Sequence, residues 1–98
     1  MVMQGDVVSV PGIDLPVLVV SRTFYNESGK MLVCPIVRED PHTTMQEAID
    51  TPAVTGYVLC DNIRQLDWKT RGYHEKGRIS AAKLLMVLDS IQSILEYI

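Results

Sequence analysis

The sequence predicts one mainly β domain that ends in a single helix. Short apolar runs rich in Val and Ile are separated by Pro, Gly, Asn and Asp rather than by helical segments. Strands in such close succession are typical of a compact barrel or a curled antiparallel sheet. A chain of 98 residues builds one hydrophobic core and not two, so residues 1–98 are expected to form a single domain.

The first half of the chain contains three predicted strands. The first covers Asp6–Val10 and stops at Pro11-Gly12, and the second covers Pro16–Ser21. The second run is apolar on both faces, which indicates a central strand. Ser21 is expected to cap a helical turn over residues 22–26, and Met31–Val37 is the third predicted strand.

The second half alternates loops and strands before the helix. A loop is expected at 38–43, and the predicted strands that follow are 44–49, Gly56–Cys60, 64–70 and 73–79, of which the last two are expected to pair. Period-two spacing places Leu66 and Trp68 on one face.

From Ser80, a predicted N-cap, the apolar residues follow a helical spacing. The spacing continues to Ile98. Four residues of this stripe are expected to face the core, with dimer contact as the alternative: Leu84, Leu88, Ile91 and Leu95.

Charge excludes a globally basic nucleic-acid binder. The net charge is −3 and the pI is about 5.2, so any nucleic-acid site must be local. The one segment with a cationic excess runs from Arg64 to Arg78, where five cations oppose Asp67 and Glu75. Mixed with Trp68, Tyr73 and His74, these cations suit single-stranded nucleic acid, although a solvated hairpin with Trp68 in the core explains the same pattern.

Cysteine and histidine usage indicates no metal and no other cofactor. Cys34 and Cys60 each lie inside an apolar run, no Cys-x-x-Cys spacing is present, and the chain has two His. Reduced, buried thiols in a cytoplasmic protein are therefore expected. No apolar run reaches the ~20 residues that span a bilayer, and the weakly charged outer face of the helix does not favour membrane binding.

One long segment resembles a known family. Residues 59–72 (Leu-Cys-Asp-Asn-Ile-Arg-Gln-Leu-Asp-Trp-Lys-Thr-Arg-Gly) are similar to the signature stretch of the MazF/PemK family of toxin–antitoxin ribonucleases. Further matching segments occur in the same order along nearly the whole chain: Gly5-Asp6-Val7-Val8, Leu15 to Ser21, Phe24-Tyr25-Asn26, Val33 to Ile36, and Lys76 to Ser80.

The resemblance implies an SH3-like barrel with a helix packed on it, a homodimer, and neutralisation by an antitoxin peptide. It also implies that single-stranded RNA is the target and that the groove and antitoxin contacts run along the signature segment. By this resemblance the RNA-binding residues are Asn62, Arg64, Trp68, Lys69 and Arg71.

The sequence departs from the family at its two catalytic positions. Active members are held to use an Arg just before the Pro of strand two and a Thr two residues after the Pro of strand three, where this chain has Leu15 and Val37. Metal-free RNA cleavage needs a group that accepts the 2′-hydroxyl proton and a donor that stabilises the phosphate. Leu and Val do neither, and the connection between the first two strands is also shortened.

Nearby residues offer a relocated catalytic site. Arg38 follows Val37 and Arg22 follows the second strand, so either could place a guanidinium at a phosphate. His42 could accept a proton near neutral pH. The simpler alternative is that Arg38 and His42 are solvated loop residues.

Three function classes therefore remain. The first is an RNA-directed toxin that cleaves mRNA without metal, and the second is a catalytically degenerate homologue that binds an antitoxin or regulates. A gyrase-directed poison on the same barrel ranks last, since its relatives typically carry a Trp near the end of the helix and this chain ends in Glu96-Tyr97-Ile98.

Overall fold

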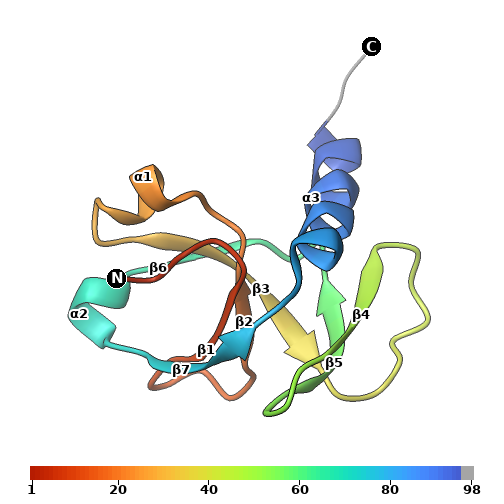
Figure 1. Cartoon of the computed structure of the whole chain (residues 1–98), viewed down its shortest axis with the longest axis horizontal. Helices are drawn as coiled ribbons and strands as arrows, with labels where there is room; N and C mark the ends of the chain where they lie inside the picture. Colours follow the sequence, from red (N-terminus) through yellow and green to blue (C-terminus); the bar gives the residue numbers. More distant parts are fainter. Residues whose placement is uncertain (96–98) are drawn as a thin grey trace.

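The computed structural model describes residues 1–95 and confirms a mainly β fold with a C-terminal helix. Two helical turns interrupt the strands (Figure 1). In chain order the elements are β1 (Asp6–Ser9), β2 (Val17–Val19), α1 (Thr23–Asn26), β3 (Met31–Val37), β4 (Gln46–Asp50), β5 (Thr55–Leu59), β6 (Arg64–Leu66), α2 (Trp68–Arg71), β7 (His74–Arg78) and α3 (Ala81–Leu95).

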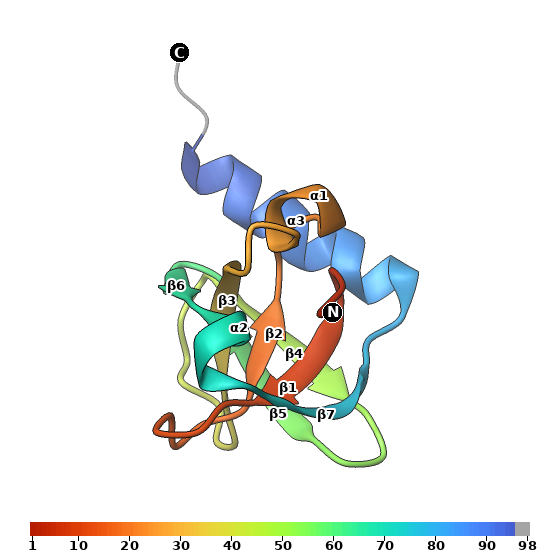
Figure 2. The same cartoon turned by 90° about the vertical axis from the view of Figure 1, so that its left-hand side faces the viewer.

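The strands form one curled antiparallel sheet organised around β3. The order is β4-β5-β3-β2-β1-β7, and β6 pairs with β3 outside this path. The N-terminal part of β3 pairs with β6 and its C-terminal part with β5, while β2 lies along its other edge. Because β3 changes partner along its length, the sheet closes into a half-barrel (Figure 2).

The hydrophobic core has two layers because both faces of the central strands are buried. Val7 and Leu18 belong to a cluster that includes Val87 and Ile91 of α3. Their neighbours Val8 and Val17 face the opposite way, into a second cluster that Trp68 and Tyr73 cover. The prediction that the second strand is central is therefore confirmed, since alternate side chains of one strand enter both clusters.

The predicted strand at 64–70 is wrong in its second half. The strand ends at Leu66, and Asp67 caps α2 by accepting a hydrogen bond from the Thr70 amide at 3.0 Å. Trp68 still reaches the same cluster as Leu66, so the alternation seen in the sequence reflected a shared core and not a continuous strand. The expected pairing of the last two strands is also wrong, because β7 pairs with β1.

Ser21 does not cap the turn that follows it. Arg22 occupies the N-cap position of α1 without a side-chain capping bond. The Ser21 hydroxyl instead donates to Asn26 Oδ1 and accepts the Leu32 amide at 2.9 Å. Asn26 is fully buried, and its side-chain amide donates to the carbonyls of Val2 and Ser21 at 3.2 and 3.1 Å. The two polar side chains thus join the N-terminus, α1 and β3.

The α3 helix begins as predicted, since Ser80 Oγ accepts the Lys83 amide at 3.1 Å. Val87 and Ile91 are buried, and Leu84 and Leu88 pack against the first cluster. Leu95 is 69% exposed, so its assignment to the core is wrong. Figure 1 gives the reason, because the end of α3 projects beyond the strands. Ile98 and the other terminal residues, 96 and 97, lie outside the described part of the chain.

Gly56 brings β5 and β3 unusually close. A Cβ atom at this position would lie 2.3 Å from the Val37 carbonyl oxygen, well inside van der Waals contact. Only glycine permits this approach, which holds the end of β3 and the residue that follows it, Arg38, against the β4–β5 hairpin.

Cys34 and Cys60 are free and fully buried thiols, as predicted. Burial is the main cause that raises the pKa of Cys34 to about 12 and that of Cys60 to about 11, and each is raised further by nearby negative charge. Among residues 1–95, no helix is long and apolar enough to cross a membrane.

Alkaline pH is expected to destabilise the fold through these thiols. Each thiol has a higher pKa in the folded chain than in the unfolded chain. The contribution of the two thiols to the free energy of unfolding is therefore complete below about pH 9 and is lost as pH rises toward 11 and 12. Urea unfolding followed between pH 7 and 10.5 measures the loss. A double Cys34→Ala, Cys60→Ala variant is expected to show a smaller decline, and an equal decline in both proteins would contradict the assignment.

Candidate functional site

Two hollows meet at Leu15, in the connection between β1 and β2. One, of about 550 Å³, reaches from Leu15 to Arg64. The other, of about 560 Å³, reaches from Leu15 to Arg38. Asp14 and Leu15 line both hollows, and we call the two hollows together the Arg64–Arg38 groove. Leu15 thus shares one hollow with Arg64 and the other with Arg38.

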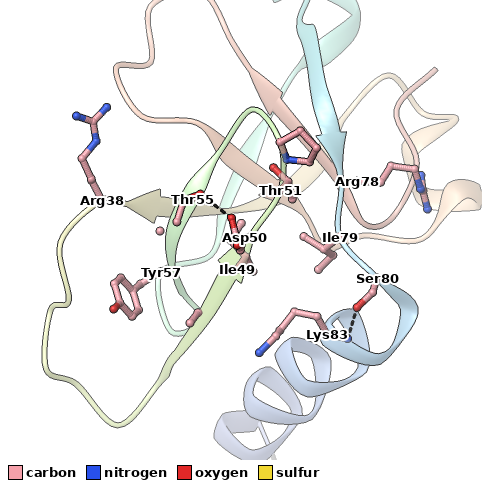
Figure 3. A pocket seen from close by; sticks show the side chains of 13 residues that line it. Arg38, Ile49, Asp50, Thr51, Thr55, Tyr57, Arg78, Ile79, Ser80 and Lys83 are labelled. Carbon is pink, nitrogen blue, oxygen red and sulfur yellow. Dashed lines mark hydrogen bonds between the residues drawn. The ribbon is translucent and has the colours of Figure 1, made fainter.

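A third hollow, of about 590 Å³, continues from the Arg38 end (Figure 3). Arg38 and Thr55 line both this hollow and the neighbouring part of the Arg64–Arg38 groove. The remaining walls come from the β4–β5 hairpin and from the start of α3. Arg38 therefore stands at the boundary between two adjoining sites.

The two substituted positions lie at or beside the groove. Leu15 is 40% exposed at the centre of the groove. Val37 is half-buried at the end of β3, where it pairs with Tyr57 and precedes Arg38. Neither side chain supplies a proton acceptor or a positive charge, so chemistry in this groove depends on the polar residues around them.

Asp14 and Thr55 are polar residues of the groove that the sequence did not single out. The Asp14 carboxylate is exposed beside Leu15 and is a group able to accept a proton. The Thr55 hydroxyl lines the Arg38 end and donates to Asp50 at 2.8 Å. The signal that could have found Asp14 is its place next to Leu15, whereas Thr55 is brought there only by the pairing of β5 with β3.

His42 lies in the exposed 38–43 loop and is not among the residues that line the three hollows. Its side chain is 86% exposed, with Nδ1 3.7 Å from Asp40 Oδ1. Hydrogen bonds from Gln46 and from the His42 amide hold the pKa of Asp40 below its usual value. The structure therefore does not bring His42 into the hollows with Arg38.

Arg22 lies at the opposite end of β3 from Arg38. It follows β2, whose Val19 pairs with Val33 near the start of β3, and its guanidinium sits 5.4 Å from the centre of the Phe24 ring. The Arg22 and Arg38 side chains therefore flank different ends of the strand and do not form one site.

The predicted RNA-binding residues are spread over several surfaces. Arg64 lines the groove, and the Arg71 guanidinium donates to the Pro11 carbonyl at 3.4 Å, beside the loop that carries Leu15. Asn62 is exposed in the turn after β5. Lys69 packs against Gly29, on the side of α1.

Trp68 is held in place by its neighbours. Its indole N–H donates to the Asn26 carbonyl at 2.9 Å, and its ring packs edge-on against Tyr73. A role for this ring in stacking on RNA stays a prediction.

Comparison with known proteins identifies the same family that residues 59–72 resemble. Residues 5–95 match the family described as PemK-like, MazF-like toxin of type II toxin–antitoxin system. A crystal structure of the MazE–MazF complex from Deinococcus radiodurans is similar at 28% identity and a TM-score of 0.88, over 96% of this chain and 95% of that one. MazF of the same organism gives 27% identity and a TM-score of 0.82, over 96% of each chain.

An endoribonuclease from a Mycobacterial species shares the fold at 21% identity and a TM-score of 0.82, over 96% of this chain and 90% of that one. No curated protein sequence matches the chain significantly. The family match covers almost the full length, and the half-barrel with its C-terminal helix is the fold of the MazF structures. The chain thus belongs to the PemK-like, MazF-like family of toxins of type II toxin–antitoxin systems.

Proposed function

We propose that this chain is an RNA-directed toxin that binds single-stranded RNA along the Arg64–Arg38 groove. The observation that carries the proposal is that Arg64 and Arg38 line two hollows that share Asp14 and Leu15. Guanidinium groups neutralise successive phosphates of a strand, while exposed apolar surface between them accommodates a base. The local cationic pair serves this purpose although the whole chain is acidic.

Cleavage in this groove is metal-independent and slow. Arg38 supplies the positive charge at the scissile phosphate, and the Asp14 carboxylate, which lines the same hollow, is the proton acceptor. The residual rate is low because Leu15 and Val37 leave the two usual catalytic positions without polar groups.

The test is cleavage of a long mixed-sequence RNA in EDTA, with mapped product ends. Wild type is expected to give discrete cuts, and Arg38→Ala is expected to reduce their rate roughly 100-fold. His42→Ala is the matched loop control and is expected to cut at the wild-type rate, since His42 lies outside the hollows. Cleavage that survives Arg38→Ala unchanged would contradict a role for this cation.

A second candidate function is an antitoxin-binding or regulatory module without catalysis. The loss of polar groups at Leu15 and Val37 favours it. RNA that stays intact at high protein concentration, together with retained RNA or antitoxin binding, would select this function over the first.

The partners we propose are an antitoxin protein and a second copy of this chain, acting in the cytoplasm. The antitoxin follows from the similarity to a MazE–MazF complex. For the dimer, the projecting end of α3 offers the exposed apolar residues Ile94 and Leu95, at 44% and 69% exposure. Such residues at the end of a helix are stabilised when a second subunit covers them.

Leu95→Asp is therefore expected to raise the dimer dissociation constant at least roughly tenfold, because a charge would be buried at the interface. Sedimentation equilibrium measures the change. Gln92→Asp, which adds the same charge at another exposed position of α3, is the control. Equal dissociation constants for both variants would place the interface elsewhere.

A further inference from the structure

We propose that the third hollow, beyond Arg38, is a nucleotide subsite that stacks a base on Tyr57 and selects guanine through Asp50. The inference rests on the proposed function, because it extends the RNA path past the end of the Arg64–Arg38 groove. The hollow measures about 590 Å³ and shares Arg38 and Thr55 with the groove. A volume of this size is sufficient for a small-molecule ligand.

The stacking surface comes from strand register. Tyr57 of β5 is paired on one side with Val37 of β3 and on the other with Ala48 of β4. Residues paired across a sheet share a face, so the Tyr57 ring stands between a half-buried Val and a small, exposed Ala. Ala48 extends only a methyl group beside the half-buried ring, which lines the hollow. Aromatic rings presented in this way are used for base stacking by proteins that bind single strands.

The polar edge of the subsite lies one pair further along the same hairpin. Asp50 and Thr55 are paired, and period two places them on the same face as Ala48 and Tyr57. Ile49 and Val58, which alternate with them, are buried on the other face. Diagonal neighbours in a sheet are about 7–8 Å apart, within reach of a base stacked on the ring.

Asp50 determines which base fits. The Thr55 hydroxyl donates to Asp50 Oδ1 at 2.8 Å and so orients the carboxylate, which is exposed in the hollow. Figure 3 shows Arg38, Tyr57 and the bonded Thr55–Asp50 pair around the same hollow. A carboxylate accepts hydrogen bonds only, and guanine presents two adjacent N–H donors on its Watson–Crick edge. Uracil presents one N–H there between two carbonyl oxygens.

Arg38 is the cation available for the phosphate. Of the cationic side chains that line the hollow, Arg78 is ion-paired with Asp6, and Lys83 lies 3.6 Å from Glu47. Arg38 is exposed and makes no ion pair within residues 1–95. One guanidinium at the boundary of the groove and the subsite can hold the phosphate that joins the two bound nucleotides.

The experiment measures binding of 2′-fluoro oligonucleotides, which lack the hydroxyl needed for cleavage, by fluorescence anisotropy. The probes are an all-uridine octamer and the same octamer with one central guanosine. Wild type is expected to bind the guanosine octamer roughly tenfold more tightly. Asp50→Asn is expected to reduce this preference to within about twofold, and Tyr57→Val is expected to weaken binding of the guanosine octamer roughly fivefold or more.

Asp89→Asn, an exposed change on α3 away from both sites, is the matched control for Asp50→Asn and is expected to match wild type. A third octamer with inosine in place of guanosine removes one donor and tests the same contact on unmodified protein. It is expected to bind more weakly than the guanosine octamer.

The outcomes separate the two proposals. One outcome would overturn the subsite and leave the groove in place. In it, Arg64→Ala weakens octamer binding, but wild type shows no preference for guanosine and Tyr57→Val binds as tightly as wild type. Failure of wild type to bind any octamer would overturn the RNA-directed function and the subsite with it.

Discussion

Replacing Leu15 by Arg together with Val37 by Thr is expected to raise the rate of RNA cleavage in EDTA at least roughly 100-fold over wild type. The resemblance to active family members places an Arg and a Thr at these positions. In this chain both lie on accessible surface, Leu15 at the centre of the Arg64–Arg38 groove and Val37 beside Arg38. The new side chains add a phosphate-binding cation and a hydroxyl donor at two positions that now carry apolar side chains.

Stability is expected to change little in this double variant, because Leu15 is 40% exposed and Thr has nearly the shape of Val. The matched control is Leu15→Gln with Val37→Thr, which has the added size and polarity but no charge. It is expected to remain near the wild-type rate. If the variant with Leu15→Arg and Val37→Thr binds RNA but cleaves it no faster than wild type, these two groups are not sufficient for catalysis in this chain. The non-catalytic function would then be favoured.

Asn26→Ala is expected to lower the free energy of unfolding by roughly 3–4 kcal/mol. The side chain is fully buried, donates to two backbone carbonyls, and accepts from the Ser21 hydroxyl. Truncation removes these bonds and leaves the Val2 and Ser21 carbonyls buried without partners, which costs more than the bonds themselves contribute. The loss is a large fraction of the stability of a typical domain.

Urea unfolding at neutral pH measures this difference, and Glu27→Ala is the control because Glu27 is the exposed next residue. Ser21→Ala is expected to show an intermediate loss, since it removes the hydroxyl that bonds Asn26 and the Leu32 amide. An effect of Asn26→Ala below about 1 kcal/mol would show that water replaces the lost partners.

Much of the fold follows from local patterns in the sequence. The Val-rich runs predicted β1, β2 and β3, and Ser80 with the change of period predicted the start of α3. These signals are local, since propensity, turn residues and a cap act within a few positions. The cap that Asp67 forms on α2 was not predicted, because the alternation of Leu66 and Trp68 in the sequence is typical of a strand.

Strand partners could not be obtained in the same way. That β7 pairs with β1, and that β3 is shared between β5 and β6, depends on how the whole sheet closes. The exposure of Leu95 has the same origin, because a periodic stripe does not reveal where the barrel beneath it ends. Long-range packing decides both, and an apolar period carries no information about it.

The sequence by itself determined the mainly β fold with a C-terminal helix and the buried thiols of Cys34 and Cys60. It also determined the family, through residues 59–72 and the matching segments around them. Only the tertiary structure decided which residues share a site. It placed Leu15 in one hollow with Arg38 and in another with Arg64, and it left His42 in solvent and Arg22 at the far end of β3. The physical reason is that a site forms where strands that are far apart in the sequence pair with one another. The close approach of Gly56 to Val37 shows how tightly this pairing holds the end of β3.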